Sequence, residues 1–227
     1  MHIILFIVVL LILVAGPGLW VKRVMARYHR PPDRYGLSGG ATARKLLDTL
    51  NLAHVGTEVT EHGDHYDPSD KTVRLSKENF DGKSLTAITI AAHEVGHALQ
   101  DAEGYSPLIL RTRLVKWVGP VEKTGAALMM ATPLIIGVTR LPLAGLLMFT
   151  GGLLTLGSAV VIHILTLPTE FDASFKRALP LLKNQDVLYA SDERHARRLL
   201  QAAALTYVSA SLLSLLNIAR WWAILRR

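Results

Sequence analysis

The chain has 227 residues, no cysteine and a formal net charge of +7, and half of its residues are hydrophobic. Its mean hydropathy of +0.30 is high for a soluble domain of this length and indicates membrane-spanning segments. The absence of cysteine excludes disulfides, thiolate metal ligands and cysteine nucleophiles. The basic excess fits either a nucleic-acid-binding protein or a membrane protein with basic loops, and the positions of the charges decide between them.

An uncharged segment over residues 3–21 is just long enough to cross a bilayer. A cleaved signal peptide would also contain an apolar run. However, no basic residue precedes this one, and Gly16-Pro17-Gly18 is a poor cleavage site. Basic residues follow instead, from Lys22 to Arg34. We therefore predict a transmembrane anchor over residues 1–21, with the next segment in the cytoplasm.

Residues 22–117 have the composition of a small soluble domain. Residues 41–52 form an amphipathic pattern typical of a helix. Residues 55–61 and 72–75 are predicted as short strands, separated by turn-forming residues. Residues 72–75 could be an edge strand that holds an extended peptide by main-chain hydrogen bonds. An ordinary structural hairpin is an equally good interpretation.

The next segment, residues 84–100, is predicted as a helix that begins after Ser84, a plausible N-cap. It contains His93, Glu94 and His97 in the H-E-x-x-H arrangement of zinc peptidases. The two imidazoles lie four residues apart on one helix face, close enough to share a metal ion. We predict that they bind Zn²⁺ and that Glu94 is the catalytic general base.

The rest of the chain alternates between apolar and polar segments. Residues 124–139 and 143–167 are apolar, and we predict a transmembrane hairpin over residues 118–167. A polar segment over residues 168–198 follows. The last segment, residues 199–227, is predicted as a transmembrane or interfacial helix, because its end combines arginines with Trp221 and Trp222.

The two spans of the hairpin return the chain to the side from which it started. Both polar segments, residues 22–117 and 168–198, therefore face the same compartment, and they hold most of the 25 basic residues. This distribution predicts that they lie in the cytoplasm. Four complete spans would put the basic C-terminus outside the cytoplasm. Either the C-terminal residues lie on that side despite their positive charge, or the last segment does not cross the membrane fully.

Catalytic zinc usually has three protein ligands, and His93 and His97 supply only two. A carboxylate on a later helix is the usual third ligand, and Glu170 is the best candidate because it directly follows a span. A first-turn glutamate stabilised by the helix dipole is the alternative interpretation. Three other histidines remain as weaker ligand candidates: His62, His65 and His163. Four residues are eligible to stabilise the oxyanion: Tyr105, Arg177, His195 and Tyr207.

The sequence resembles the neutral zinc metallopeptidase family of bacterial membrane proteins typified by YugP. The matching motifs are HYDP at 65–68, VRLS at 73–76, AAHEVGHALQ at 91–100, LPTEFDAS at 167–174 and AALTYV at 203–208. The resemblance implies a membrane-bound, zinc-dependent peptidase. The Glu170 segment is also similar to the ligand helix of other gluzincins, which usually place an aspartate four residues later. Here Ser174 has that position, and Asp172 comes earlier.

The predicted fold is an α-helical membrane protein with about four transmembrane helices and a small α+β zincin-like catalytic domain that carries the H-E-x-x-H helix. The leading hypothesis is a multi-pass zinc endopeptidase of the bacterial inner membrane, embedded in the lipid bilayer, that hydrolyses membrane-associated polypeptides on the cytoplasmic side. The alternative is a membrane scaffold or regulator with a structural or vestigial zinc site. Nucleic-acid binding is disfavoured because topology explains the basic charge. The sequence does not predict the oligomeric state.

Overall fold

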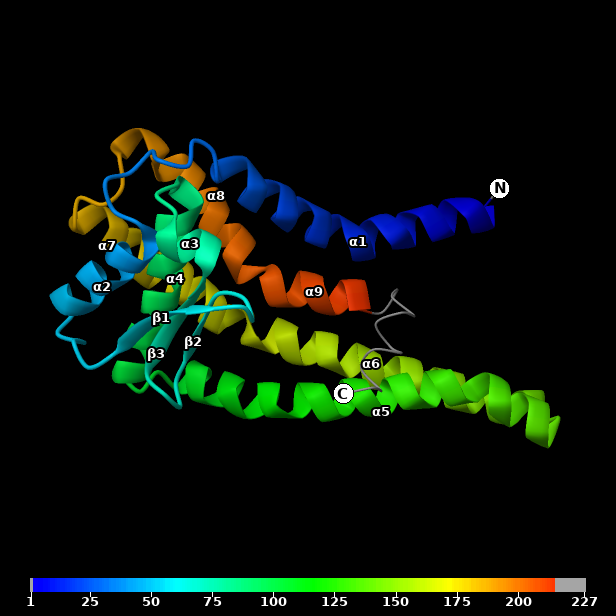
Figure 1. Ribbon diagram of the computed structural model, residues 1–227. Helices are drawn as coiled ribbons and strands as arrows, with labels where there is room; N and C mark the ends of the chain where they lie inside the picture. Colours follow the sequence, from blue (N-terminus) through cyan, green and yellow to red (C-terminus); the bar gives the residue numbers. More distant parts are fainter. Residues whose placement is uncertain (1, 215–227) are drawn as a thin grey trace. The chain divides into compact units, whose positions relative to one another are not determined.

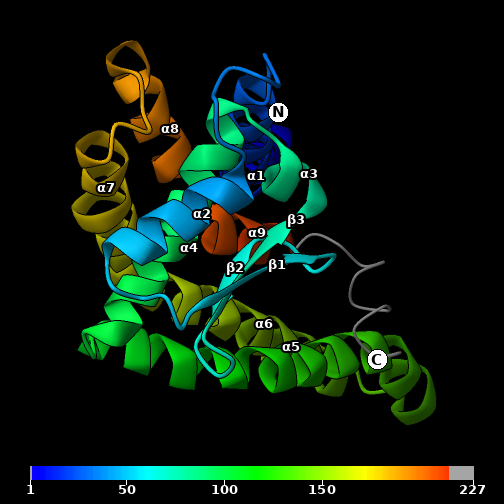
Figure 2. The ribbon, with the colours of Figure 1, turned by 60° about the vertical axis from the view of Figure 1, so that its left-hand side comes forward.

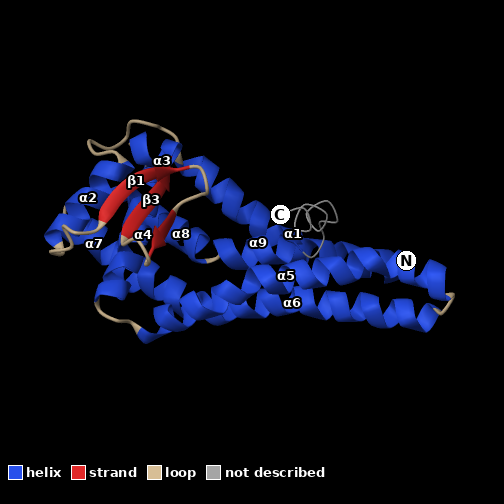
Figure 3. Cartoon of the chain, turned by 60° about the horizontal axis from the view of Figure 1, so that its bottom comes forward, coloured by secondary structure: helices blue, strands red, loops and turns tan. Residues whose placement is uncertain are grey.

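The computed structural model describes residues 2–214, and it is mostly helical with one small sheet (Figures 1 and 3). The described chain divides into two compact units. Residues 2–18, 110–166 and 207–214 belong to the first, which we call the helical unit. Residues 19–109 and 167–206 form the second, which we call the α+β unit.

The sheet of the α+β unit has the strand order β1-β3-β2. The strands are β1 (Gly56–Thr60), β2 (His65–Asp67) and β3 (Thr72–Ser76). Strand β3 pairs parallel with β1 and antiparallel with β2, and its alternating buried residues, Val73 and Leu75, point into the core. The prediction that residues 72–75 form a sheet edge is therefore wrong. The error arose because β2 is only three residues long and lies among turn-forming residues.

Helix α4 (Leu85–Ala102) is the central helix of the α+β unit, and it begins where the sequence predicted. The Ser84 hydroxyl caps it by accepting a hydrogen bond from the Ala87 N–H at 3.1 Å. Nearly every residue of α4 is buried, the polar residues of the H-E-x-x-H motif included, so α4 is enclosed by the rest of the unit. Figure 2 shows α4 beside the sheet and α2 (Gly39–Thr49).

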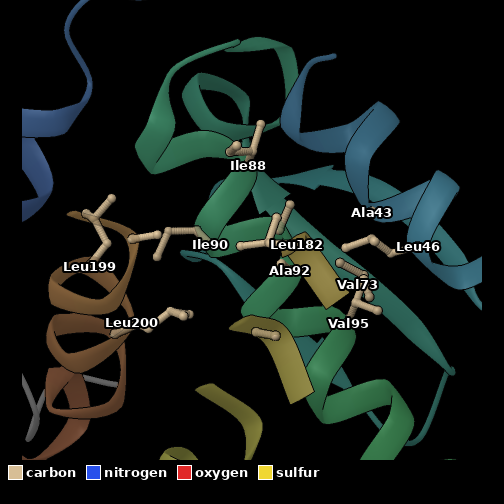
Figure 4. Close-up of a cluster of buried hydrophobic side chains, with 14 of the residues drawn as sticks. Ala43, Leu46, Val73, Ile88, Ile90, Ala92, Val95, Leu182, Leu199 and Leu200 are labelled. Atoms are coloured by element: carbon tan, nitrogen blue, oxygen red, sulfur yellow. The ribbon is translucent and has the colours of Figure 1, made fainter. Parts of the chain in front are cut away.

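The hydrophobic core forms around α4, as shown in Figure 4. Helix α2 supplies Ala43 and Leu46, and β3 supplies Val73. Side chains from α7 (Leu179–Asn184) and α8 (Glu193–Ala204) complete it. The other elements that lie wholly within this unit are the short α3 (Lys77–Asp81), the π-helical η1 (Asp172–Ala178) and the 3₁₀ turn η2 (Ala190–Asp192). The core therefore joins segments that are distant in the sequence.

Four α-helices contribute residues to the helical unit: α1 (His2–Tyr28), α5 (Ser106–Thr139), α6 (Pro142–Phe171) and α9 (Thr206–Ser214). Two helical segments among the described residues, Ser106–Thr139 and Pro142–Asn184, are long and apolar enough to cross a membrane. They contain the predicted apolar runs 124–139 and 143–167. An arrangement with four spans goes beyond this finding and stays a prediction.

The apolar stretch over residues 199–219 is not one continuous helix. Helix α8 ends at Ala204, and α9 begins at Thr206. Leu199 and Leu200 of α8 are fully buried in the core of the α+β unit. Apolar content alone does not distinguish a helix buried in protein from one that crosses a bilayer. The predicted interfacial residues 220–227 lie outside the described residues.

Candidate metal centre

The structure brings His93, His97 and Glu170 together inside the α+β unit. His93 and His97 extend from α4, and Glu170 lies near the end of α6, within the part of α6 that belongs to this unit. Glu170 Oε2 is 3.3 Å from His93 Nε2 and 3.2 Å from His97 Nε2. All three side chains are buried. Within residues 2–214, they are the one group of His, Asp and Glu side chains whose geometry suits a metal ion, with ligand atoms within 4.8 Å of one another.

Gly96 allows the two ligand-bearing segments to approach this closely. A Cβ atom at this position would lie 2.7 Å from the backbone oxygen of Ala173 in η1. A side chain of any size would therefore push η1 away from α4. Because Ala173 is only three residues from Glu170, that displacement would move the carboxylate away from the imidazoles.

The helix that carries Glu170 changes from α to π geometry two residues after the ligand, where η1 begins. In this wider turn, Asp172 accepts a hydrogen bond from Arg177 Nε, five residues later, at 2.7 Å. Ser174 lies 3.0 Å from His93 Nδ1. Single π turns inside α-helices occur frequently at functional sites. Here the turn places Ser174 and Asp172 against different residues of α4.

Hydrogen bonding determines which nitrogen of His93 carries the proton. The Ser174 hydroxyl donates to the backbone carbonyl of Leu200 at 3.1 Å. The hydroxyl hydrogen is thus used, and Ser174 Oγ acts as an acceptor toward His93 Nδ1–H. In the neutral imidazole, this leaves the lone pair on Nε2, the nitrogen that faces Glu170.

Gln100 fixes His97 in the same tautomer. The Gln100 amide group donates to the Thr169 carbonyl and to Asp172 Oδ2, each at 2.9 Å. Both partners are acceptors, so the Nε2 atom of Gln100 must face them and Oε1 must face His97. His97 Nδ1–H then donates to Gln100 Oε1 at 2.9 Å. The lone pair of His97 Nε2 is directed to Glu170.

These residues fit a zinc ion by the chemistry of their donor atoms. Two imidazole lone pairs and one carboxylate oxygen converge in a buried space, where three acceptors repel one another without a cation between them. Two histidines and one glutamate are an established ligand set for catalytic zinc. A hydrogen bond from the outer nitrogen of each ligating histidine is also typical of zinc sites. Glu94, the predicted general base, is buried on α4 next to His93.

The other sequence candidates lie in different environments. His62 is exposed, and His65 Nδ1 lies 2.8 Å from the Gly63 carbonyl oxygen in a turn. His163 belongs to the helical unit, where its ring stacks on Tyr207 with centroids 5.8 Å apart. None of these histidines belongs to the metal-binding group found among the described residues.

The four residues considered for the oxyanion also differ in their contacts. Arg177 forms ion pairs with Asp172 and Glu103, and its guanidinium carbon lies 5.4 Å from the centre of the Tyr105 ring. The His195 ring lies 5.1 Å from the ring of Tyr28. Tyr207 is in the helical unit. Arg177 and Tyr105 are therefore parts of one cluster near the end of α4.

Sequence reasoning missed the supporting residues Gln100 and Ser174. Gln100 is three residues after His97, so the two side chains share a helix face, and this spacing was a usable signal. Ser174 is four residues after Glu170, where the resemblance led us to expect aspartate. Its contact with His93 depends on the π geometry of η1. No feature of the local sequence indicates that the helix changes from α to π geometry there.

His93 and His97 of α4 and Glu170 of α6 form a buried donor set that could hold a metal ion, and this combination of ligands is the one that many zinc peptidases use. A family model described as "Putative neutral zinc metallopeptidase" matches residues 3–226. The chain is also 36% identical over 203 residues to the "Putative membrane protease YugP" of Bacillus subtilis (strain 168), covering 88% of this chain and 86% of that protein. The chain therefore belongs to this neutral zinc metallopeptidase family, and the predicted resemblance is confirmed. No solved structure gives a significant match.

Proposed function

We propose that this protein is a membrane-embedded zinc endopeptidase that hydrolyses membrane or membrane-proximal polypeptides. The observation that carries the proposal is the convergence of His93, His97 and Glu170, with both imidazoles fixed as the tautomers that direct Nε2 inward. Membership of a zinc metallopeptidase family supports the reaction class. The two candidate spans and the name of the Bacillus relative support the membrane.

A zinc ion held by His93, His97 and Glu170 would supply Lewis-acid chemistry, which activates water as a nucleophile and polarises the scissile carbonyl. Glu94 accepts the proton of the attacking water and delivers it to the leaving amine, as a general base and then a general acid. The two histidines and Glu170 hold their donor atoms in place throughout. Because these side chains are buried, their electrostatic interactions are stronger than they would be in bulk water.

The proposed location is the bacterial inner membrane, with several spans and the α+β unit on the cytoplasmic side. Residues 1–21 and 118–167 are proposed as membrane segments, and residues 199–227 as a segment that crosses or lies at the interface. Residues 22–117 and 168–198 would supply the zinc ligands. The clusters of basic residues that adjoin the apolar segments support this orientation.

A Glu94→Gln variant tests the proposal directly. Purified in detergent or reconstituted in lipid, it should retain zinc at the wild-type stoichiometry but lose cleavage of casein or a membrane-protein substrate by at least roughly 100-fold. A His93→Ala variant should lose the metal. Undiminished cleavage by Glu94→Gln would refute the proposed mechanism. A strain with Glu94→Gln that keeps its full cellular function would favour the scaffold or regulator.

A further inference from the structure

Gln100 joins the two segments that supply the metal ligands. Its carbonyl oxygen accepts from His97 Nδ1–H, while its amide nitrogen donates to the carbonyl of Thr169, the residue before Glu170. The side chain is fully buried, with 0% exposure. One uncharged side chain therefore contacts a ligand on α4 and the backbone next to the ligand on α6.

A chain of charged residues holds Gln100 in this orientation. Its amide also donates to Asp172 Oδ2, the same oxygen that accepts from Arg177 Nε. Arg177 Nη1 in turn donates to Glu103 Oε2 at 2.8 Å. Glu103 is the C-cap of α4. The contacts thus form a closed ring that leaves α4 at Gln100, crosses η1 and returns to the end of α4.

We propose that Gln100 is a positioning residue that fixes His97 and Glu170 relative to each other, and that its two N–H donors are as important as its acceptor oxygen. This inference rests on the proposed zinc site. It distinguishes Gln100 from a residue that only accepts a hydrogen bond from a ligating histidine, a task that a carboxylate performs equally well or better. At this position a carboxylate would instead face the Thr169 carbonyl and the Asp172 carboxylate, with no hydrogen to offer either.

A Gln100→Glu variant separates the two roles because it keeps the shape and the acceptor but removes both donors. We expect its zinc dissociation constant, measured by chelator competition on the full-length protein in detergent, to rise by about 10–100-fold. At saturating zinc, kcat should fall while KM changes little, since the altered group holds the ligands rather than the substrate. Gln201→Glu, on the exposed face of α8, is the matched control and should match the wild type in both measurements.

Zinc affinity at or above the wild-type value in Gln100→Glu would overturn the inference, since an acceptor alone would then suffice. Should that variant fail to fold, Asp172→Asn is the second test. It keeps the side-chain size but removes the charge that orients Gln100, and we expect severalfold weaker zinc binding. Wild-type zinc affinity in Asp172→Asn would likewise overturn the inference.

The failure of this inference is distinguishable from the failure of the proposed function. A wild-type protein that does not bind zinc, or a Glu94→Gln variant that still cleaves, would remove the proposed function itself. A zinc-binding wild type with an inactive Glu94→Gln variant and a Gln100→Glu variant of normal zinc affinity would refute only the role of Gln100.

Discussion

The two units use their apolar residues in opposite ways. In the α+β unit, α4 is enclosed by protein, and polar side chains such as His93, Gln100 and Glu170 lie inside with at most 3% of their surface exposed. In the helical unit, large apolar side chains face outward, and Val138 and Leu154 are 74% and 75% exposed. A soluble protein rarely exposes apolar residues in such density. The exposed apolar side chains of the helical unit are those expected under the proposed placement of this unit in lipid.

The difference shows why overall hydropathy is a poor guide to where a helix lies. An apolar helix that is covered by protein belongs to a protein core, as α4 does. An apolar helix with exposed leucines, such as α6, is suited to a bilayer. Some buried polar groups of the α+β unit, His93 and Glu170 among them, also carry the proposed chemistry. Similar substitutions in the two environments test this contrast.

The largest effect is expected for the carboxylate of the buried site. Glu170→Gln keeps the size of the side chain but removes the negative charge, so the zinc dissociation constant should rise by roughly 100-fold or more. Glu61→Gln, at an exposed loop position, should leave zinc affinity unchanged. Equal zinc affinity in the wild type and Glu170→Gln, by chelator competition, would exclude Glu170 as a ligand.

The next largest effect is expected for a lysine on the exposed face of α6, which should reduce membrane insertion. Leu154→Lys puts a charge on the exposed face of α6, and a charge near the centre of a membrane span costs about 3 kcal/mol of insertion free energy. We expect less protein in the membrane fraction. Val59→Lys changes a side chain that is 47% exposed on strand β1, and it should have little effect. Similar membrane recovery of both variants would contradict a lipid-facing α6.

Most of the metal site could be predicted from the sequence, because the i, i+4 spacing of His93 and His97 and the position of Glu170 after an apolar run are local patterns. The helix α4 and its cap were predictable for the same reason. The central position of β3 in the sheet could not be predicted, because strand order depends on pairings between distant residues. The same holds for Ser174, which contacts His93 only because the helix widens at η1.

Helix packing provides the third test. Gly96→Ala would place a Cβ atom 2.7 Å from the Ala173 backbone oxygen, and such overpacking costs about 1–3 kcal/mol in the free energy of unfolding. Zinc affinity should fall as well, because η1 directly follows the end of α6 that carries Glu170. Gly119→Ala in α5 adds a Cβ with nothing within 4 Å, so it should be neutral or stabilising by up to about 1 kcal/mol. Thermal unfolding with and without zinc measures both; equal behaviour of the two variants would count against close packing at Gly96.

The smallest effect is expected at a second buried carboxylate of the α+β unit, Asp192. Burial raises the pKa of Asp192, but hydrogen bonds from Arg34 and Tyr35 outweigh this and lower it below the ordinary value. A folded-state pKa below the unfolded one means that the stabilisation is present above the unfolded pKa and is lost as the pH falls through the folded value.

Asp192→Asn should therefore lower the free energy of unfolding by about 1–2 kcal/mol at pH 7, a modest value because Arg34 is partly exposed. The difference from the wild type should shrink below about pH 4, where the unfolded carboxyl takes up its proton. Denaturant unfolding followed by circular dichroism at several pH values measures this difference. A constant difference from pH 7 to pH 3 would show that Asp192 stabilises the unit through packing and not through its charge. Zinc affinity should stay at the wild-type value in this variant, since a buried carboxylate outside the metal site supports the fold alone.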